Sequence, residues 1–147
     1  MSPDGSAAGD LHHVSVVVAS IAESLPFYRD TLRMHAGPIR DVADQHVRVV
    51  FLSAPNARIE LIEPTDDASG AARFLVERGK PTLHHLCFVV EDLRATLGAL
   101  AARGVELIDR EPRSGAEGDV AFLHPRASGG VLVELIDRAS LQRPHTS

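Results

Sequence analysis

Two short stretches of this chain occur twice, LHHV and LHHL at Leu11–Val14 and Leu83–Leu86, and IELIEP and VELID at Ile59–Pro64 and Val133–Asp137. The repeats are evenly spaced, since 72 residues separate His13 from His85 and 74 separate Glu60 from Glu134. Each half therefore carries one His and, 47 or 49 residues later, one Glu within an apolar segment. Internal similarity of this kind predicts two half-domains that share one core.

Length and composition predict a single soluble domain. At 147 residues the chain is long enough to bury a core, and its net charge of −5 comes without the basic stripe of a nucleic-acid-binding protein. No apolar run reaches membrane-spanning length, and the single Cys87 favours a reducing compartment. We therefore expect a cytoplasmic protein with no nucleic-acid or membrane partner, and flexible tails over residues 1–9 and 139–147.

A strand and an amphipathic helix open the first half. His12–Ala19 is rich in β-branched residues, which favours a strand. Ser20 and Glu23 have capping-box spacing and predict a helix over about 21–34, in which Pro26 should cause a local distortion. The residues expected on the buried face of this helix are Ile21, Leu25, Tyr28 and Leu32.

A hairpin and a linking helix complete the first half. Val47–Ser53 and Arg58–Glu63 are apolar segments on either side of a turn-forming Ala-Pro-Asn sequence. A short helix over about 71–78 follows, and Gly79 should end it.

The second half repeats this plan. Leu83–Val90 predicts a strand, and Asp92 can cap a helix that runs to Arg103 and stops at Gly104. Leucines 93, 97 and 100 should face inward, and further strands are expected at about 106–110, 120–124 and 131–136. The predicted fold class is α+β, with two tandem βαβββ modules at about 11–64 and 83–137 in a single domain over 10–138. The modules should form a curved mixed sheet around a metal-binding cavity.

Strand geometry selects one His from each His-His pair, because neighbouring residues in a strand point to opposite faces. One face of each strand is uniformly apolar and suits packing under a helix. The other carries the small residues Ser15 and Cys87 and suits a cavity wall. The candidate ligands on that face are His13 and His85, and the residues treated as structural are His12 and His84.

Two imidazoles and two carboxylates in a cavity suit a divalent metal ion. A single strand His usually serves as a hydrogen-bonded core residue, and a single Glu usually faces solvent. Repetition of both at matched spacing argues for function, because burial of an unpaired carboxylate is unfavourable. The predicted metal ligands are His13, Glu60, His85 and Glu134.

The paired modules resemble the vicinal oxygen chelate superfamily, and residues 11–136 are similar to the methylmalonyl-CoA epimerase family within it. The most specific matching stretch is FLHPRASGGVLVEL at Phe122–Leu135. Other matching stretches are FYRDTL (27–32), DQHVRVVFL (44–52), FLVERG (74–79) and GVELIDREPRSGA (104–116). The resemblance implies the same four metal ligands. It also implies Co²⁺ as the metal, with Mn²⁺, Mg²⁺, Ni²⁺ or Zn²⁺ as alternatives, and a homodimer.

The reaction implied is the interconversion of (2R)- and (2S)-methylmalonyl-CoA through a metal-stabilised enolate. It removes a proton between a thioester and a carboxylate and returns it to the other face. Two carboxylates on opposite sides of that carbon would therefore act as base and acid. Glu134 is the first of these, and the second is Glu60 or Asp44, with Glu60 ranked higher. We expect substrate contacts at Gln45, Ser128, Gly129 and Gly130, and Arg113 and Arg126 are candidates for the CoA phosphates.

Several positions depart from the family pattern near the expected substrate entrance. The residue before the first ligand, commonly Asp, is His12, and a usual Pro-Glu-Gln-Gly is Ala43–His46 here. Val49 stands where some relatives carry Glu. Another acyl thioester, or the hemithioacetal of a glyoxalase I-type isomerase, is therefore an alternative substrate. A metal-free small-molecule-binding resistance protein is a further alternative, and the fourth ligand argues against an extradiol dioxygenase.

Overall fold

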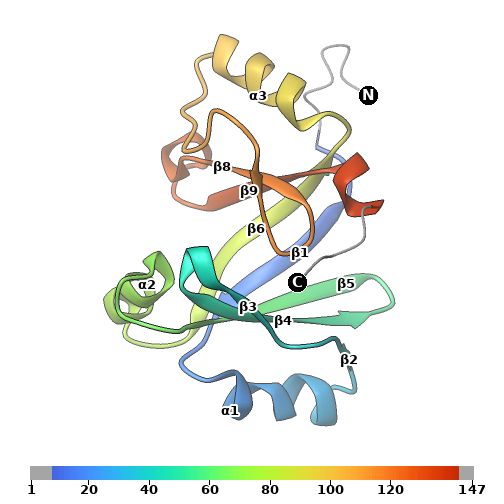
Figure 1. Cartoon of the computed structure of the whole chain (residues 1–147), viewed down its shortest axis with the longest axis vertical. Helices are drawn as coiled ribbons and strands as arrows, with labels where there is room; N and C mark the ends of the chain where they lie inside the picture. Colours follow the sequence, from blue (N-terminus) through green and yellow to red (C-terminus); the bar gives the residue numbers. More distant parts are fainter. Residues whose placement is uncertain (1–7, 143–147) are drawn as a thin grey trace. The chain divides into compact units, whose positions relative to one another are not determined.

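The structure is a computed structural model, and it describes residues 8–142 of the chain (Figure 1). The chain divides into two compact units. One contains residues 13–84, and the other contains residues 85–142 together with residues 8–12. We call them the first and the second unit and describe each by itself.

The strands of the first unit pair in the order β2, β4, β5 and β1, with β3 also on β4. β1 (Leu11–Val17) lies parallel to β5 (Ala57–Pro64), and β5 is antiparallel to β4 (Val47–Ala54). The short strands β2 (His35–Ala36) and β3 (Arg40–Val42) pair with β4 as well. The predicted hairpin is confirmed, and its two-residue turn pairs Ala54 with Ala57 and so sets the register of β4 on β5.

The predicted first helix is shorter than expected. Ser20 caps α1 (Ile21–Pro26) by accepting a hydrogen bond from Glu23 N, which confirms the capping prediction. After Pro26, which has no N–H to continue the helical ladder, the chain enters a π-helical turn, η1 (Phe27–Thr31). Leu32 N then bonds to Phe27 O, five residues back, and Leu32 is 53% exposed. The expectation that Leu32 lies on the buried face is therefore wrong, because the wider turn rotates it out of the core.

α1 covers one face of the β4–β5–β1 sheet (Figure 1). The core between them is formed by Val18, Ile21, Leu25, Val50, Leu52 and Leu61, with Val16 and Tyr28 packed at its edge. α2 (Gly70–Arg78) follows as predicted and ends at Gly79, whose φ of 73° is the left-handed C-cap conformation that glycine adopts without strain.

The second unit contains β6 (Thr82–Val90) from His85 onward, β9 (Leu132–Asp137), β8 (Asp119–Leu123) and β7 (Arg113–Ser114), paired in that order. β6 and β9 are parallel, and the other pairs are antiparallel. α3 (Leu93–Ala102) is capped by Asp92 as predicted, and it packs Leu93 and Leu97 against β8 and β9. Parallel and antiparallel pairs and packed helices confirm the α+β class.

The strand expected at about 106–110 is wrong. Its only ladder contact among the described residues is an isolated bridge between Leu107 and Leu123. Ile108 N and Asp109 N both donate to Phe122 O, at 3.0 and 3.1 Å. Because two successive donors share one carbonyl, the regular alternation of a strand is lost, and a two-residue strand, β7, forms further along instead.

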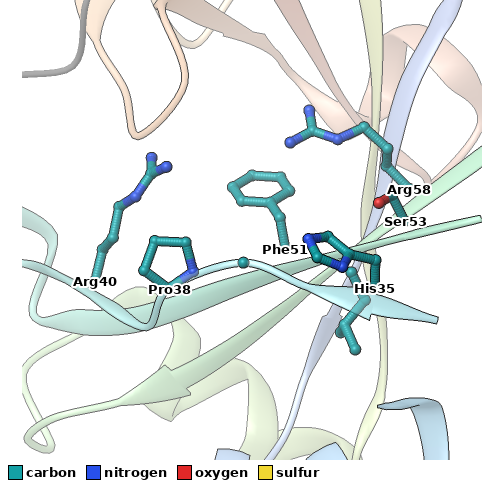
Figure 2. A pocket seen from close by; sticks show the side chains of 8 residues that line it. His35, Pro38, Arg40, Phe51, Ser53 and Arg58 are labelled. Carbon is teal, nitrogen blue, oxygen red and sulfur yellow. The ribbon is translucent and has the colours of Figure 1, made fainter. Parts of the chain in front are cut away.

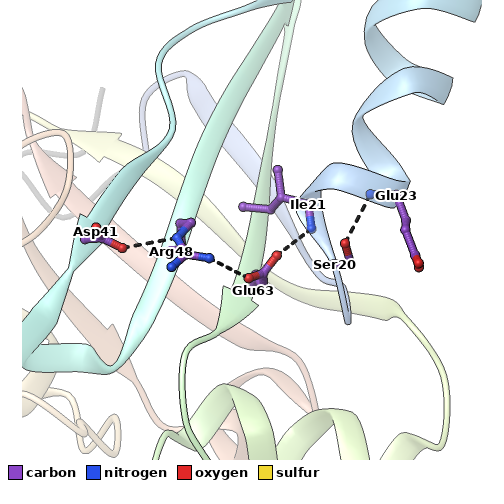
Figure 3. Close-up of polar contacts among 6 residues, drawn as sticks. All are labelled: Ser20, Ile21, Glu23, Asp41, Arg48 and Glu63. Carbon is purple, nitrogen blue, oxygen red and sulfur yellow. Dashed lines mark hydrogen bonds and ion pairs between the residues drawn. The ribbon is translucent and has the colours of Figure 1, made fainter.

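The last acid of each repeated segment docks the helix of its own unit. Glu63 Oε1 accepts from Ile21 N at 2.7 Å in the first unit, and Asp137 Oδ1 accepts from Leu93 N at 2.8 Å in the second. Each carboxylate thus satisfies a free N–H in the first turn of a helix. Glu63 also binds Arg48 (Figure 3).

Residue 9 and residues 139–142, expected to belong to flexible tails, join the fold. Gly9 N donates to Val89 O at 2.7 Å, so residue 9 already joins the fold. At the other end Arg138–Gln142 forms the 3₁₀ turn η4, and the buried Ser140 accepts a hydrogen bond from Asp119 N. Residues 1–7 and 143–147, where the flexible tails were predicted, lie outside the described residues. Every helix of the described residues falls short of the length and apolarity that crossing a bilayer requires.

Candidate active site

The first unit holds a buried His–Glu pair on neighbouring strands. His13 on β1 and Glu60 on β5 are 4% and 7% exposed. His13 Nε2 lies 3.4 Å from Glu60 Oε1. The parallel register places Ser15 directly across from Glu60, and Ser15 Oγ donates to Glu60 Oε1 at 2.5 Å. The hydroxyl therefore fixes the orientation of a carboxylate that the apolar surroundings would otherwise disfavour.

An aromatic ring and an arginine support this pair. Phe51 on β4 faces Glu60 across the hairpin, and its ring meets the His13 imidazole at 83° with 5.2 Å between the centroids. Arg58 Cζ lies 4.6 Å from the centroid of Phe51. The same ring thus contacts both the imidazole and the guanidinium.

The second unit holds a matching pair. His85 on β6 and Glu134 on β9 are 5% and 8% exposed, and His85 Nε2 lies 3.0 Å from Glu134 Oε1. Cys87 occupies the register position across from Glu134 that Ser15 occupies across from Glu60. The two units thus present the same pair, with a thiol in one where the other has a hydroxyl.

The aromatic support is repeated too. Phe122 on β8 is the register partner of Glu134, and its ring meets His85 at 88° with 5.3 Å between the centroids. Arg113 Cζ lies 5.2 Å from the Phe122 centroid, and its Nε lies 3.3 Å from Asp109 Oδ2. Sequence reasoning missed both phenylalanines. The two-residue turn of the first hairpin was the signal that would have placed Phe51 opposite Glu60.

The structure brings the predicted ligands together within each unit, as His13 with Glu60 and His85 with Glu134. The residues of each His-His pair that were treated as structural are less buried. His84 packs edge-to-face against Phe74 of α2, with 4.7 Å between the ring centroids. This contact agrees with a structural role for His84.

Two other expected residues lie in the 3₁₀ turn η2 (Ala43–Gln45). Asp44 is exposed and Gln45 is half-buried. His46 follows with a φ of 57°, and its Nδ1 lies 2.8 Å from Asp66 Oδ2.

The glycine turn expected to contact substrate is an exposed loop. Ser128 ends the 3₁₀ turn η3 (Pro125–Ser128), and its hydroxyl donates to Pro125 O and accepts from Val131 N. Gly129 and Gly130 have φ values of 82° and 125°, and a Cβ at either position would meet nothing within 4 Å. The Ser128 hydroxyl therefore stabilises the loop in which it lies, and the two glycines leave open space beside the backbone.

The arginines considered for CoA phosphates both hold acidic partners of the second unit. Arg113 pairs with Asp109, and Arg126 makes two hydrogen bonds to Glu106, at 2.7 and 3.0 Å. The Glu106 carboxylate holds the pKa of Arg126 above its ordinary value by hydrogen bonding and charge. Their charge is thus already balanced within the unit.

Known proteins share this sequence and fold. The profile of the Glyoxalase/Bleomycin resistance protein/Dioxygenase superfamily matches residues 12–122. The chain is 38% identical over 129 residues to an ethylmalonyl-CoA/methylmalonyl-CoA epimerase of Cereibacter sphaeroides, a match that covers 86% of this chain and 96% of the relative.

Two solved structures agree with this relationship. A crystal structure of methylmalonyl-CoA epimerase from Mycobacterium tuberculosis is 34% identical, with a TM-score of 0.85, and covers 93% of this chain and 91% of that one. A methylmalonyl-CoA epimerase in complex with methylmalonyl-CoA and NH₄⁺ is 26% identical, with a TM-score of 0.84, and covers 94% of this chain and 100% of that one. The chain belongs to the methylmalonyl-CoA epimerase family, within the Glyoxalase/Bleomycin resistance protein/Dioxygenase superfamily.

Proposed function

We propose that this protein is a methylmalonyl-CoA epimerase that interconverts (2R)- and (2S)-methylmalonyl-CoA. The observation that carries the proposal is the buried His–Glu pair that recurs at equivalent strand positions in the two units. The relatives named as epimerases of this substrate support it. No other cluster of the described residues joins buried imidazoles to buried carboxylates in this repeated way.

We propose that the two pairs together hold one divalent metal ion through His13, Glu60, His85 and Glu134. Two donors at about 2.1 Å from one metal lie about 3.0 Å apart at an angle of 90° and about 3.4 Å apart at the tetrahedral angle. The His–Glu separations of 3.0 and 3.4 Å fit this range. Such an ion, Co²⁺ by family resemblance with Mn²⁺, Mg²⁺, Ni²⁺ or Zn²⁺ as alternatives, supplies Lewis-acid stabilisation of negative charge on the substrate.

The carboxylates of the pairs are the proposed proton carriers. Epimerisation needs one group to take the α-proton and another to return it from the opposite face, and each must lie within hydrogen-bond reach of the carbon's proton. Glu134 is the first candidate and Glu60 the second. Ser15 donates to Oε1 of Glu60 and so orients this carboxylate. Asp44 ranks below both because it is exposed on η2.

The aromatic rings and the burial of the pairs serve the same chemistry. Phe51 and Phe122 cover the imidazoles on one side and exclude water from them. Electrostatic stabilisation is stronger where water is excluded, so the buried donors can stabilise the charge that develops when the α-proton leaves. Substrate contacts are proposed at Gln45 and along Ser128, Gly129 and Gly130.

Ethylmalonyl-CoA is a proposed second substrate. The C. sphaeroides relative, 38% identical to this chain, is named for both ethylmalonyl-CoA and methylmalonyl-CoA. The two substrates differ by one methylene, and a hydrophobic pocket discriminates such a difference by only about 1–3 kcal/mol. We further propose that the enzyme acts in the cytoplasm as a homodimer, on the basis of its single buried thiol and its family resemblance.

Deuterium exchange tests the proposed function directly. Protein loaded with Co²⁺ is incubated with methylmalonyl-CoA in D₂O, with and without EDTA, and deuterium at the α-carbon is followed by mass spectrometry. We expect rapid exchange that EDTA abolishes and that added Co²⁺ restores. Metal-loaded protein that exchanges no deuterium would exclude this substrate, and ethylmalonyl-CoA and a glutathione hemithioacetal would be assayed next. Protein that takes up no metal would support the alternative of a metal-free small-molecule-binding resistance protein.

A further inference from the structure

A pocket of about 150 Å³ lies in the first unit, and one of the residues that line it is Phe51, whose ring packs against His13. Three of the described residues that line it are basic, His35, Arg40 and Arg58, and none of them is acidic. Phe51 and Ser53 form part of its wall. Figure 2 shows the two arginine side chains on either side of the Phe51 ring.

The register of the sheet explains why these residues meet. His35 on β2 pairs with Ser53 on β4, and Ser53 pairs with Arg58 on β5, so these three side chains form one row across the strands. Phe51 lies two residues before Ser53 and therefore on the same face of β4. Arg40 on β3 pairs with Val49, again two residues away, and so extends the same face.

The same face carries the first His–Glu pair. Glu60 is the register partner of Phe51 and lies two residues after Arg58. Ser15, across from Glu60, and His13, two residues before Ser15, continue this face onto β1. The opposite face packs against α1. The basic pocket and the His13–Glu60 pair therefore share one face of the sheet, and the Phe51 ring contacts both Arg58 and His13.

Several carboxylates near the pocket in this unit bind other groups. Asp41, next to Arg40, accepts from Arg48 at 3.2 Å (Figure 3). Glu63 accepts from Arg48 and from Ile21 N, and Asp66 pairs with His46. The described residues that line the pocket thus include basic side chains and no carboxylate.

We propose that this pocket is an oxyanion subsite for the thioester substrate, an inference that rests on the proposed function. Arg40 and Arg58 would donate charge-assisted hydrogen bonds to the anion, and the Ser53 hydroxyl and the His35 ring offer further donors. A CoA thioester brings oxyanions of two kinds, the phosphates of the nucleotide and the free carboxylate of the acyl group. Both kinds present the oxygen acceptors that a guanidinium recognises.

Binding of three thioesters distinguishes the two sources. Propionyl-CoA has the phosphates and no free carboxylate, methylmalonyl-pantetheine has the carboxylate and no phosphate, and propionyl-pantetheine has neither. Their dissociation constants are measured by calorimetry for metal-loaded wild type, Arg40→Gln and Arg58→Gln. Arg58→Lys tests whether a positive charge without the guanidinium group is sufficient for binding. Arg29→Gln is the matched control, since Arg29 is an exposed arginine of the same unit that pairs with Asp30.

We expect each Gln variant to weaken binding of one charged thioester by about tenfold, because it removes a charge-assisted hydrogen bond to that thioester. Binding of propionyl-pantetheine should be unchanged. Weaker binding of propionyl-CoA would show that the pocket binds phosphate. Weaker binding of methylmalonyl-pantetheine would show that it binds the carboxylate. Arg58→Lys should recover part of the loss, and Arg29→Gln should match the wild type. Equal weakening of all three thioesters would overturn the proposal, since it would indicate a structural role, and so would no weakening at all.

The exchange assay on the same preparations separates this inference from the proposed function. If binding depends on the arginines but no deuterium is exchanged, the subsite proposal stands and the proposed epimerase activity is refuted. If the wild type exchanges deuterium but the arginine substitutions do not change binding, the proposed epimerase activity stands and the subsite proposal is refuted. Wild-type protein that binds none of the three thioesters would overturn both.

Discussion

Ser15 Oγ donates a 2.5 Å hydrogen bond to Oε1 of Glu60, and neither residue is more than 7% exposed. The bond joins β1 to β5 at the position where the parallel register sets the two residues side by side. In the second unit a cysteine stands across from Glu134. The two carboxylates proposed to carry protons thus differ in the group that lies across from them.

Replacement of Ser15 by Ala should weaken both stability and metal binding. The buried Glu60 carboxylate would lose a donor, which costs about 1–3 kcal/mol of unfolding free energy. Loss of a partner that orients a metal ligand typically lowers affinity by about 10–100-fold. Urea unfolding and a competitive metal titration measure the two effects. Ser15→Cys, which copies the second unit, should retain more affinity than Ser15→Ala. An alanine variant that binds metal as tightly as the wild type would show that the hydroxyl does not position Glu60.

Glu134→Gln should retain some metal and lose catalysis. The amide keeps an oxygen donor but cannot take a proton, so the rate of deuterium exchange should fall by about 10²–10⁴-fold. The measurement is α-carbon exchange at saturating metal, with bound metal quantified in the same sample. Glu106→Gln is the control, because Glu106 is an exposed carboxylate of the same unit that pairs with Arg126. Undiminished exchange in Glu134→Gln would remove Glu134 from the proton transfer.

Addition of a divalent metal should raise the melting temperature. A ligand that binds only the folded state at 100 times its dissociation constant contributes about 2.7 kcal/mol. In a chain of this length that corresponds to roughly 5–11 °C. Differential scanning fluorimetry with and without Co²⁺ detects the shift. His13→Ala should abolish most of it, whereas His46→Ala should not, because His46 is exposed and bound to Asp66. An equal shift in both variants would place the metal elsewhere.

Asp66 should contribute to stability in a pH-dependent way. A hydrogen bond from Ala68 N, followed by the His46 ring, holds the pKa of Asp66 below its ordinary value of 3.8. A lowered folded-state pKa adds stability that is fully present above the unfolded-state pKa and is lost as the pH falls through the folded-state value. The stability difference between wild type and Asp66→Asn should therefore be constant above about pH 5 and shrink towards lower pH.

Urea unfolding between pH 2 and pH 7 measures this difference. Asp67→Asn, a neighbouring exposed carboxylate, controls for the general effect of removing one negative charge. A difference that does not change with pH would mean that the contacts of Asp66 do not distinguish its two protonation states.

The prediction of the first helix shows where local reasoning was sufficient and where it was not. The Ser20 cap depends on a side chain and a backbone N–H three residues later, and the structure contains that bond. The end of the helix depends on how the chain continues past Pro26, where the π turn changes the angle between successive side chains. Helical periodicity assumes a constant angle, and for that reason it misplaced Leu32.

The repeated acids show the same division. The sequence contains ELIE and ELID, and the residue types alone do not tell which of the two acids in each segment has which role. In the structure Glu60 faces His13, while Glu63 binds the first N–H of α1. Residues three positions apart in a strand point to opposite faces of the sheet, so alternation alone places the two acids on different faces. What Glu63 binds depends on where α1 packs, which alternation does not describe.

The sequence by itself determined the candidate ligands, because a repeated motif and the two-residue period of a strand are local properties that need no knowledge of packing. It identified His13, Glu60, His85 and Glu134 and the faces on which they lie. Only the tertiary structure placed the Phe51 ring beside His13 and gathered His35, Arg40 and Arg58 into one pocket. These residues come from five strands, β1 to β5, and their proximity depends on the register of each strand pair, which is set by hairpin turns and long-range pairing.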